Sequence, residues 1–570
     1  MSELLKVLSS QYKHLPSRPD AVVDAHVIKE ISTLKNQPCH FQVLYRVKGD
    51  AFCHPVSIAF ESELPLSVWR VDYVAVPCIA NPHGEKGFES NLPGLFPDIL
   101  MSRPLAPTIT KCPLAWGNET YFEKDTDVLL NATKNDFQSL FVAVNENRDI
   151  VSPGIYPIKI KLISLYTGEL LDQNVFNITV IDACAPENNI YYTNWFHVDC
   201  LCDTFNVSPY SNEFYEVFDE YVANMTRHRQ NTLLLPAFTP PLDTPIGGER
   251  KNVQLVDIER KNREWHFSFD RMQRYIRHAK QGGIKYFEHC HLFSQWGAKG
   301  APNIYLADGT RIFDICTDAQ SEVYVTFIRA YLQAFLAFAK EEKIDNALLF
   351  HISDEPSLNH FDSYSKAYHS VADLLNGKTV ADAMSDPFFY EKGVVDQPIA
   401  SVIHADAFES KCPAFWLYYT GGSSEKNCAN RLITNTAART RVLGIQMYSY
   451  RAVGFLNWAY NFHYDRMSQG IYSPLSFVGG YKNYPGLSYL AYPITSGCGA
   501  RVLPSLREKL MAEAFDDLSA LTLLESLIGR EKTLAICEEK LGKINTQTIP
   551  QGNDLYELRE EINRQIAASF

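Results

Sequence analysis

The sequence predicts a multidomain protein of mixed α/β and β class. It comprises an N-terminal antiparallel β-sandwich, a (β/α)8 TIM barrel that is degenerate at one point, and C-terminal helices packed on the barrel. Three observations lead to this prediction. Strand-like runs without helical periodicity fill the chain to about residue 182, eight strand candidates with helices between most of them follow, and helical periodicity dominates from about Pro504. The predicted domains are residues 1–182, 190–503 and 504–570.

Alternation of apolar and charged residues indicates the sandwich. In the segment 156–162, Ile158, Ile160 and Leu162 point to one side while Lys159 and Lys161 point to the other. Such alternation is typical of a strand with one buried face, and several such strands without intervening helices favour an antiparallel sandwich. No cluster of titratable residues stands out in this region, so we expect it to be a structural or accessory domain.

The barrel is predicted from the alternation of strands and helices. The strand candidates are residues 191–198, 231–238, 284–288, 346–352, 379–384, 399–404, 414–419 and 453–459. Helical stripes separate most of them, as in a parallel sheet built from β-α units. The segment 405–413 is too short for a full crossover helix, so we expect a degenerate barrel there.

Composition excludes several classes of function. The chain has 570 residues and a net charge of −13, without a Lys/Arg run, so nucleic acid is not an expected partner. No apolar stretch is long enough to span a membrane. The 13 cysteines show no zinc or redox spacing and are expected to be reduced thiols, and no signal peptide is recognisable, so we expect a cytoplasmic protein without a cofactor.

An acidic pair at the end of the fourth strand candidate is the strongest local signal. The run His351-Ile-Ser-Asp354-Glu355-Pro356 places it at the rim where barrels build active sites. Pro356 favours an extended Glu355 and an end to the strand. Repulsion between adjacent carboxylates should raise the pKa of one of them. A glycosidase needs one protonated carboxyl to donate to the leaving oxygen.

This motif resembles the catalytic motif of glycoside hydrolase family 123, whose C-terminal region was formerly a domain of unknown function. Four further stretches, 194–199, 415–420, 441–461 and 492–509, resemble other parts of that family in the same order. The resemblance covers about residues 190–520.

The resemblance implies a retaining β-N-acetylgalactosaminidase acting on a small glycoside or glycan by substrate-assisted catalysis. Glu355 would be the general acid and then the general base. Asp354, ionised, would hold the acetamido N–H of the substrate. The acetamido oxygen would attack the anomeric carbon and give an oxazoline-type intermediate, so no protein nucleophile is needed.

Further side chains are predicted to contact the substrate. Trp416 and Trp458 offer flat faces to a sugar ring, and Tyr419 or Tyr448 could donate to the acetamido oxygen. The other candidates are His197, Asp199, Glu288, His289, Gln446, Asn457 and Asn461. A metal at residues 288–291 is not expected, because consecutive strand residues point in opposite directions.

Two alternatives remain open at this point. A two-carboxylate glycosidase would use Glu288, Asp199 or Asp465 as its nucleophile and would cleave substrates without an N-acetyl group. A non-catalytic carbohydrate-binding protein would bind sugar without hydrolysis. The sequence does not decide between N-acetylgalactosamine and N-acetylglucosamine, and it leaves the aglycone and the oligomeric state undetermined.

Overall fold

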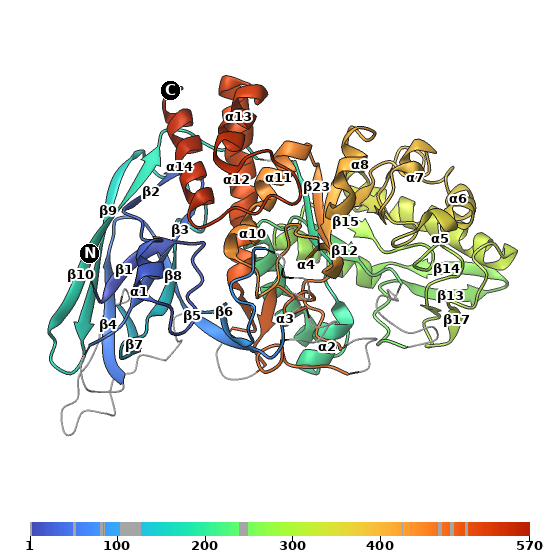
Figure 1. The fold of residues 1–570 in the computed structure, drawn as a ribbon. Coiled ribbons are helices and arrows are strands. Elements are labelled where there is room, and N and C mark those ends of the chain that lie inside the picture. Colours follow the sequence, from blue (N-terminus) through green and yellow to red (C-terminus); the bar gives the residue numbers. More distant parts are fainter. Residues whose placement is uncertain are drawn as a thin grey trace.

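The computed structural model in Figure 1 places an N-terminal pair of sheets beside a larger α/β region, with long helices between them. It describes residues 3–48, 53–79, 84, 86–102, 127–187, 189–238, 249–424, 426–465, 470–478, 484–495 and 500–570. Within them, no helix combines the length and the apolar character that a membrane crossing requires. The ten cysteines whose side chains are described are all free.

The N-terminal region contains two five-stranded sheets. The first has the order β1 (Leu5–Ser9), β3 (Cys39–Tyr45), β8 (Gln138–Val144), β5 (Leu66–Val76) and β6 (Gly94–Ser102). The second has the order β2 (Glu30–Leu34), β10 (Leu170–Ile181), β9 (Gly154–Ser164), β4 (Cys53–Glu61) and β7 (Asp127–Thr133). Every pair is antiparallel except β10 with β2, and a short helix, α1 (Asp20–Asp24), precedes β2.

A shared apolar core joins these two sheets. Ile158, Ile160 and Leu162 on β9 are fully buried, which confirms the predicted alternation. They belong to one core cluster with residues of the first sheet. Within this cluster, the ring of Phe41 on β3 lies 4.9 Å from the ring of Phe176 on β10. Each sheet therefore buries one face against the other, as in a β-sandwich.

The larger region contains two parallel sheets. One has the order β11 (Tyr191–Asn194), β23 (Gly454–Asn457), β22 (Trp416–Tyr419), β21 (Ile399–Ser401) and β20 (Ala383–Met384). The other has the order β12 (Thr232–Leu235), β15 (Tyr286–His289), β18 (Leu348–Phe350) and β19 (Thr379–Val380). All eight predicted strand segments are present, and β19 and β20 both come from the segment 379–384.

Helices separate most of these strands. They are α2 (Val198–Phe205), α3 (Asn212–Arg227), α4 (Asp270–Gln281), α5 (Glu322–Glu341), α6 (Phe361–His369), α7 (Phe388–Glu391), α8 (Ala405–Glu409), α9 (Gly421–Ser424), α10 (Ala437–Arg441) and α11 (Leu443–Tyr450). The side chain of Ser211 caps α3 by accepting from the Phe214 amide at 3.1 Å. The connection before β22 holds only the five-residue α8, as its length predicted.

This region also contains short hairpins and 3-10 turns. The hairpins are β13 (Asp257–Lys261) with β14 (Glu264–Ser268), β16 (Ile304–Tyr305) with β17 (Arg311–Phe313), and β24 (Ala491–Pro493) with β25 (Val502–Pro504). The single 3-10 turns are η1 (Asp345–Ala347), η2 (Leu358–His360) and η3 (Val402–His404). The hairpins are not predicted from the sequence: β13 and β14 are mostly polar and exposed and resemble loops, whereas β24 and β25 are buried but only three residues long each.

The C-terminal helices are α12 (Leu506–Ile528), α13 (Arg530–Leu541) and α14 (Asp554–Ala567). As expected, α12 packs on the larger region, against α10 and α11, but it also contacts β6 of the sandwich and so lies between the two halves of the molecule (Figure 1). It is therefore buried on all sides along most of its length, including charged residues such as Arg507 and Asp517.

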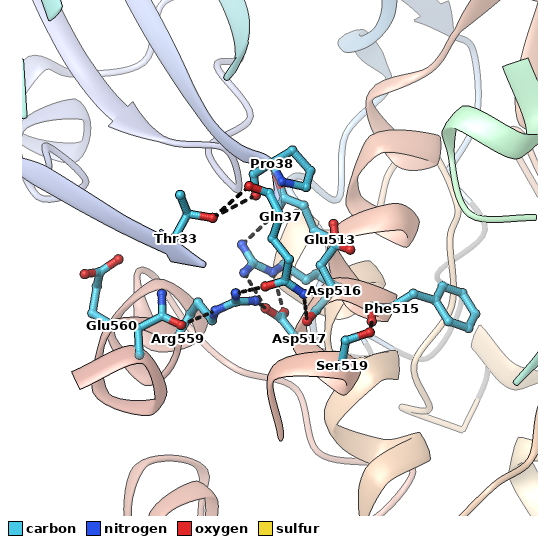
Figure 2. A network of polar contacts seen from close by, with 12 residues as sticks. Thr33, Gln37, Pro38, Glu513, Phe515, Asp516, Asp517, Ser519, Arg559 and Glu560 are labelled. Carbon is cyan, nitrogen blue, oxygen red and sulfur yellow. Dashed lines mark hydrogen bonds and ion pairs between the residues drawn. The ribbon is translucent and has the colours of Figure 1, made fainter. Parts of the chain in front are cut away.

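A polar network shown in Figure 2 ties the sandwich to α12 and α14. Gln37, which follows β2, donates to the backbone oxygen of Asp516 at 3.0 Å and accepts from Arg559 of α14. Arg559 also donates to Asp517 at 2.9 Å. The buried charges of Arg559 and Asp517 are thus paired beside the junction, as low-dielectric surroundings require, and Gln37 of the sandwich joins them through its neutral amide.

Glu508 on α12 gives a prediction about pH-dependent stability. It is buried, and Tyr460 and Asn224 donate to it at 2.7 Å and 2.9 Å. Burial raises the pKa of this carboxyl from 4.5 to about 7. The folded state therefore holds this proton more tightly than the unfolded state does, so stability falls as pH rises between those two values.

We expect Glu508→Gln to abolish this loss, which is on the order of 3 kcal/mol in the free energy of unfolding. Urea unfolding at about pH 4.5 and about pH 7.5 measures it. Glu187→Gln is the control, because the Glu187 side chain is 85 % exposed. A wild-type pH dependence that survives in Glu508→Gln would contradict the prediction.

Candidate active site

The end of β18 is held in place by the loop that follows β15. Leu292, Phe293 and Trp296 donate backbone hydrogen bonds to the oxygens of residues 351, 352 and 354, at 2.9, 3.1 and 2.8 Å. These bonds extend the β15–β18 pairing beyond the strands. The segment that carries the acidic pair is therefore fixed by backbone contacts as far as Asp354.

The acidic pair lies just beyond this segment, where the chain turns sharply. Asp354 is half-buried and Glu355 is exposed. Glu355 has a φ of +42°, in the left-handed region, although its position before Pro356 led us to expect an extended residue. The strand β18 has ended before the acidic pair, as predicted, and the turn itself contains a strained left-handed residue. Backbone strain of this kind concentrates at functional sites.

Tyr418 of β22 connects to this pair. Its hydroxyl donates to Glu355 Oε1 at 2.9 Å, although Tyr418 itself is buried. Burial and then the nearby Glu355 carboxylate raise the pKa of Tyr418 well above its ordinary value, so it stays a hydrogen-bond donor. The ends of β18 and β22 are thereby linked through the candidate general acid.

Tyr418, and not the predicted Tyr419, is the tyrosine of β22 that contacts the acidic pair. Tyr419 points to the other face of β22, packs against Phe455 with ring centres 4.8 Å apart, and has a buried hydroxyl without a hydrogen-bond partner. Trp416 is also placed away from the rim: it lies at the start of β22, fully buried, stacks on Tyr191, and donates to Gln397 at 3.1 Å. Both side chains are core residues here.

The pKa of Asp354 departs from the role that the family resemblance implies. Burial, then the Glu355 charge and then the Asp382 charge raise it well above its ordinary value, while His351 opposes them. The expected rise within the pair is therefore confirmed, but it falls on Asp354, which we expected to be the ionised member. The surroundings of Asp354 therefore oppose its ionisation.

Glu288 and His289 separate onto opposite faces of β15. Glu288 points toward the end of β18, where its carboxylate contacts His351 at 2.9 Å and accepts from Trp195 at 3.0 Å. His289 points to the helices and contacts the Tyr331 hydroxyl of α5 at 2.8 Å. His289 is therefore not a rim residue, because strand alternation turns it away from the acidic pair.

The ends of β11 and β23 bring four predicted residues together. The amide side chain of Asn461 joins the backbone of His197, and His197 Nε2 lies 3.0 Å from the Trp458 oxygen. Asp199 forms a buried ion pair with Arg250 at 2.6 Å. Burial and then the Arg250 charge lower the pKa of His197 to about 3, so its imidazole is neutral.

Gln446 and Tyr448 lie elsewhere. Both are on α11: Gln446 donates to the Asn545 oxygen at 2.9 Å, and the Tyr448 hydroxyl donates to Glu525 of α12 at 2.6 Å. The structure thus places them against the C-terminal helices. Asn457 donates to the Ala459 oxygen, and Asp465 accepts from the Gly470 amide in a local turn.

Four residues of this region escaped sequence analysis as site candidates: Trp195, Arg250, Asp382 and Tyr418. Asp382 had a usable signal, because an acid within the apolar strand candidate 379–384 requires a buried partner. The side-chain direction of Tyr418 depends on which residue begins the strand, and the sequence leaves that open by one position.

Comparisons with known proteins agree with the resemblance. The chain matches the family model described as the glycoside hydrolase 123 catalytic domain over residues 195–524, which includes every site residue above. A solved family 123 glycoside hydrolase from Clostridium perfringens, reported in a study of glycolipid glycan hydrolysis, has a TM-score of 0.69 at 12 % identity. That alignment covers 99 % of this chain and 97 % of that chain. No curated protein matches.

Two other solved structures are much less similar. A Bacteroides uniformis β-glucuronidase has a TM-score of 0.26 at 8 % identity, covering 85 % of this chain and 49 % of that chain. A family 5 glycoside hydrolase from Bacteroides vulgatus has a TM-score of 0.28 at 12 % identity, covering 49 % and 59 %. Neither supports an argument. The family model matches more than half of the chain, and the chain therefore belongs to glycoside hydrolase family 123.

Proposed function

We propose that this protein is a retaining glycosidase that releases terminal β-linked N-acetylgalactosamine from small glycosides or glycans by substrate-assisted catalysis. The observation that carries the proposal is the Asp354–Glu355 pair, fixed at a strand end within a family 123 catalytic domain. Adjacent carboxylates suit this mechanism, because they act on neighbouring atoms of one substrate and need no gap between them for a nucleophile.

The reaction begins with one proton shared by the pair. The acetamido N–H of the substrate donates to Asp354, and a hydrogen bond to the ionised form lowers the proton affinity of a carboxyl. The proton then resides on Glu355, which gives it to the leaving oxygen as the glycosidic bond breaks. The acetamido oxygen forms the new bond to the anomeric carbon, and the aglycone leaves as an alcohol.

The second half of the reaction reverses these roles. Glu355, now ionised, takes a proton from water as the water oxygen attacks the anomeric carbon and opens the oxazoline-type ring. Two displacements at one carbon retain its configuration. Tyr418 supports Glu355 throughout, since its hydroxyl holds the carboxylate in one orientation.

We also propose that the two parallel sheets are halves of one (β/α)8 barrel. At one junction β19 and β20 are only two residues apart in a single segment. At the other, the Asn231 amide at the start of β12 donates to the Tyr192 oxygen of β11 at 3.2 Å. In such a barrel the residues that follow β18 and β22 share the catalytic rim.

The placement of the alternative nucleophiles supports assistance by the substrate. Glu288 is buried and contacts His351 and Trp195, and Asp199 is paired with Arg250. A carboxylate neutralised in this way is a poor nucleophile, because attack would break its ion pair. A binding protein without turnover would not need the strained turn at Glu355.

Three aryl glycosides test the proposal: β-N-acetylgalactosaminide, β-N-acetylglucosaminide and β-galactoside. We expect hydrolysis of the first, with retention of configuration. Equal hydrolysis of the second would move the specificity to N-acetylhexosamines in general. Comparable hydrolysis of the galactoside would overturn substrate assistance, and binding without hydrolysis would favour the carbohydrate-binding alternative.

Tyr418 provides a more local prediction. Tyr418→Phe removes the hydrogen bond to Glu355, and we expect kcat/KM on the aryl N-acetylgalactosaminide to fall about tenfold, as for the loss of one bond to a charged group. Tyr419→Phe is the matched control on the adjacent residue, whose hydroxyl has no partner. Equal effects of the two substitutions would contradict the assignment.

A further inference from the structure

A buried ion triad lies next to the acidic pair. His351 Nε2 is 2.9 Å from Glu288 of β15, and His351 Nδ1 is 3.2 Å from Asp382, which lies between β19 and β20. The three side chains are at most 1 % exposed. The catalytic roles proposed above for Asp354 and Glu355 use none of these three groups.

Each acid of the triad is itself held by donors. The indole N–H of Trp195 donates to Glu288 at 3.0 Å. Asp382 accepts from the Tyr364 hydroxyl and from the backbone amides of Ile352 and Ser353, at 3.0 to 3.3 Å for the amides. Asp382 therefore fixes both His351 and the two residues directly before Asp354.

The protonation state of His351 follows from its partners. Both ring nitrogens face carboxylates, so both carry protons. Burial lowers the pKa of His351, but the hydrogen bonds and charges of Asp382 and Glu288 outweigh burial and raise it to about 10. His351 is therefore an imidazolium at neutral pH.

The other groups around His351 add no opposing charge of their own. His291 follows β15, its ring lies 4.9 Å from that of His351, and burial followed by the His351 charge lowers its pKa, so it is neutral. Trp195 covers another side at 5.8 Å. Asp354 and the neutral His289 also sense the His351 charge.

We propose that His351 is a positioning residue whose permanent positive charge, held by Glu288 and Asp382, allows the neighbouring Asp354 to ionise when the substrate arrives. The proposal rests on the function proposed above. Burial, Glu355 and Asp382 all oppose an ionised Asp354, and His351 is the group that favours it. Without that charge, every remaining influence on Asp354 would oppose the ionised form that accepts the acetamido N–H.

The same residues could be interpreted as a metal site. Ligand atoms of His291, His351 and Asp382 lie within 4.8 Å of one another. A metal would, however, need an unprotonated His351 nitrogen and would displace one of its carboxylate contacts. The complete set of hydrogen bonds favours the imidazolium, and metal binding is an outcome that the experiment distinguishes.

The experiment compares pH–rate profiles of full-length variants on the aryl β-N-acetylgalactosaminide. For His351→Gln we expect kcat to fall more than tenfold with KM changed little, and the acidic limb of kcat to move to higher pH by about one unit, the effect of removing a nearby opposite charge. Asp382→Asn removes a like charge from Asp354, while Glu288 still keeps His351 protonated, and should move that limb to lower pH. Shifts of the same sign would overturn the proposal.

His289→Gln is the matched control. This buried histidine is one residue from Glu288 but faces α5, so its loss should lower stability and leave the pH profile unchanged. Dialysis against EDTA with and without added Zn²⁺ tests the metal alternative. Loss of activity in EDTA and its return with Zn²⁺ would overturn the imidazolium.

A readout without activity separates this proposal from the function. NMR of histidine labelled in the ring, assigned by the signal missing in His351→Gln, should show His351 protonated at about pH 8.5, two units above an ordinary histidine. A neutral His351 would overturn the proposal even in an active enzyme. Absence of hydrolysis with a protonated His351 would instead count against the proposed function.

Discussion

Glu355→Gln is expected to lower kcat/KM for glycosides with poor leaving groups about a thousandfold, the usual contribution of a positioned general acid. Gln has the shape of Glu but no proton to give. Aryl glycosides with strongly activated leaving groups need little protonation, so much of the bond-cleaving step should return with them. Stability should change little, because Glu355 is exposed. Steady-state kinetics over a series of leaving groups measures the effect.

Asp354→Asn is the variant to compare with Glu355→Gln. Its kcat/KM should fall by a similar factor and should not recover on activated substrates, because the lost interaction is with the acetamido group and not with the leaving oxygen. It should also raise the free energy of unfolding at neutral pH. Burial and the neighbouring carboxylates raise the pKa of Asp354, so the folded state holds this proton more tightly than the unfolded state does, and stability falls as pH rises above 3.8.

The two substitutions therefore differ in stability as well as in leaving-group dependence. Where an active site contains a group whose ionisation its surroundings oppose, replacing that group by a neutral one usually raises the free energy of unfolding. If Asp354→Asn unfolded more easily than the wild type, the carboxylate would be a structural anchor. If Glu355→Gln kept full activity on poor leaving groups, the acid would be another residue.

Much of the fold could be predicted because its strands are short apolar runs between turn residues. The alternation around Ile158 and Ile160 predicted a strand with one buried face. The short connection 405–413 predicted that no full-length crossover helix forms there. The central place of α12 could not be predicted. A helix that buries charged residues such as Asp517 shows no amphipathic stripe, and its partners Arg441 and Arg559 are distant in sequence.

The candidate site divides in the same way. The acidic pair stands out because it follows an apolar strand, but the contacts of a single side chain depend on where its strand starts. If the strand starts one residue earlier or later, Tyr419 instead of Tyr418 faces the acidic pair. The same alternation of side chains places Glu288 and His289 on opposite faces of β15. The contact between Glu288 and His351 joins two strands and cannot be found from local pattern.

The largest stability effect is expected from Asp98→Asn. Asp98 of β6 in the sandwich and Arg507 of α12 are both fully buried, and Arg507 donates to its two oxygens at 2.9 Å. Arg507 also donates to the oxygens of Gly486 and Tyr489, at 2.7 and 3.0 Å. The substitution leaves a buried guanidinium without a counter-charge, so the free energy of unfolding should fall by about 3 to 5 kcal/mol.

The exposed pair between Arg329 and Asp373 supplies the control, since Asp373→Asn should cost less than about 1 kcal/mol. Asp98 lies in one half of the molecule, and the other partners of Arg507 lie in the other. Loss of the Asp98 charge should therefore lower the denaturation midpoints of both halves together. Near-UV circular dichroism and residual hydrolysis measure these midpoints. A cost within that of the control would mean that other contacts of α12 hold the halves together, such as Gln37 with Asp516 and the apolar cluster that contains Leu510 and Phe141.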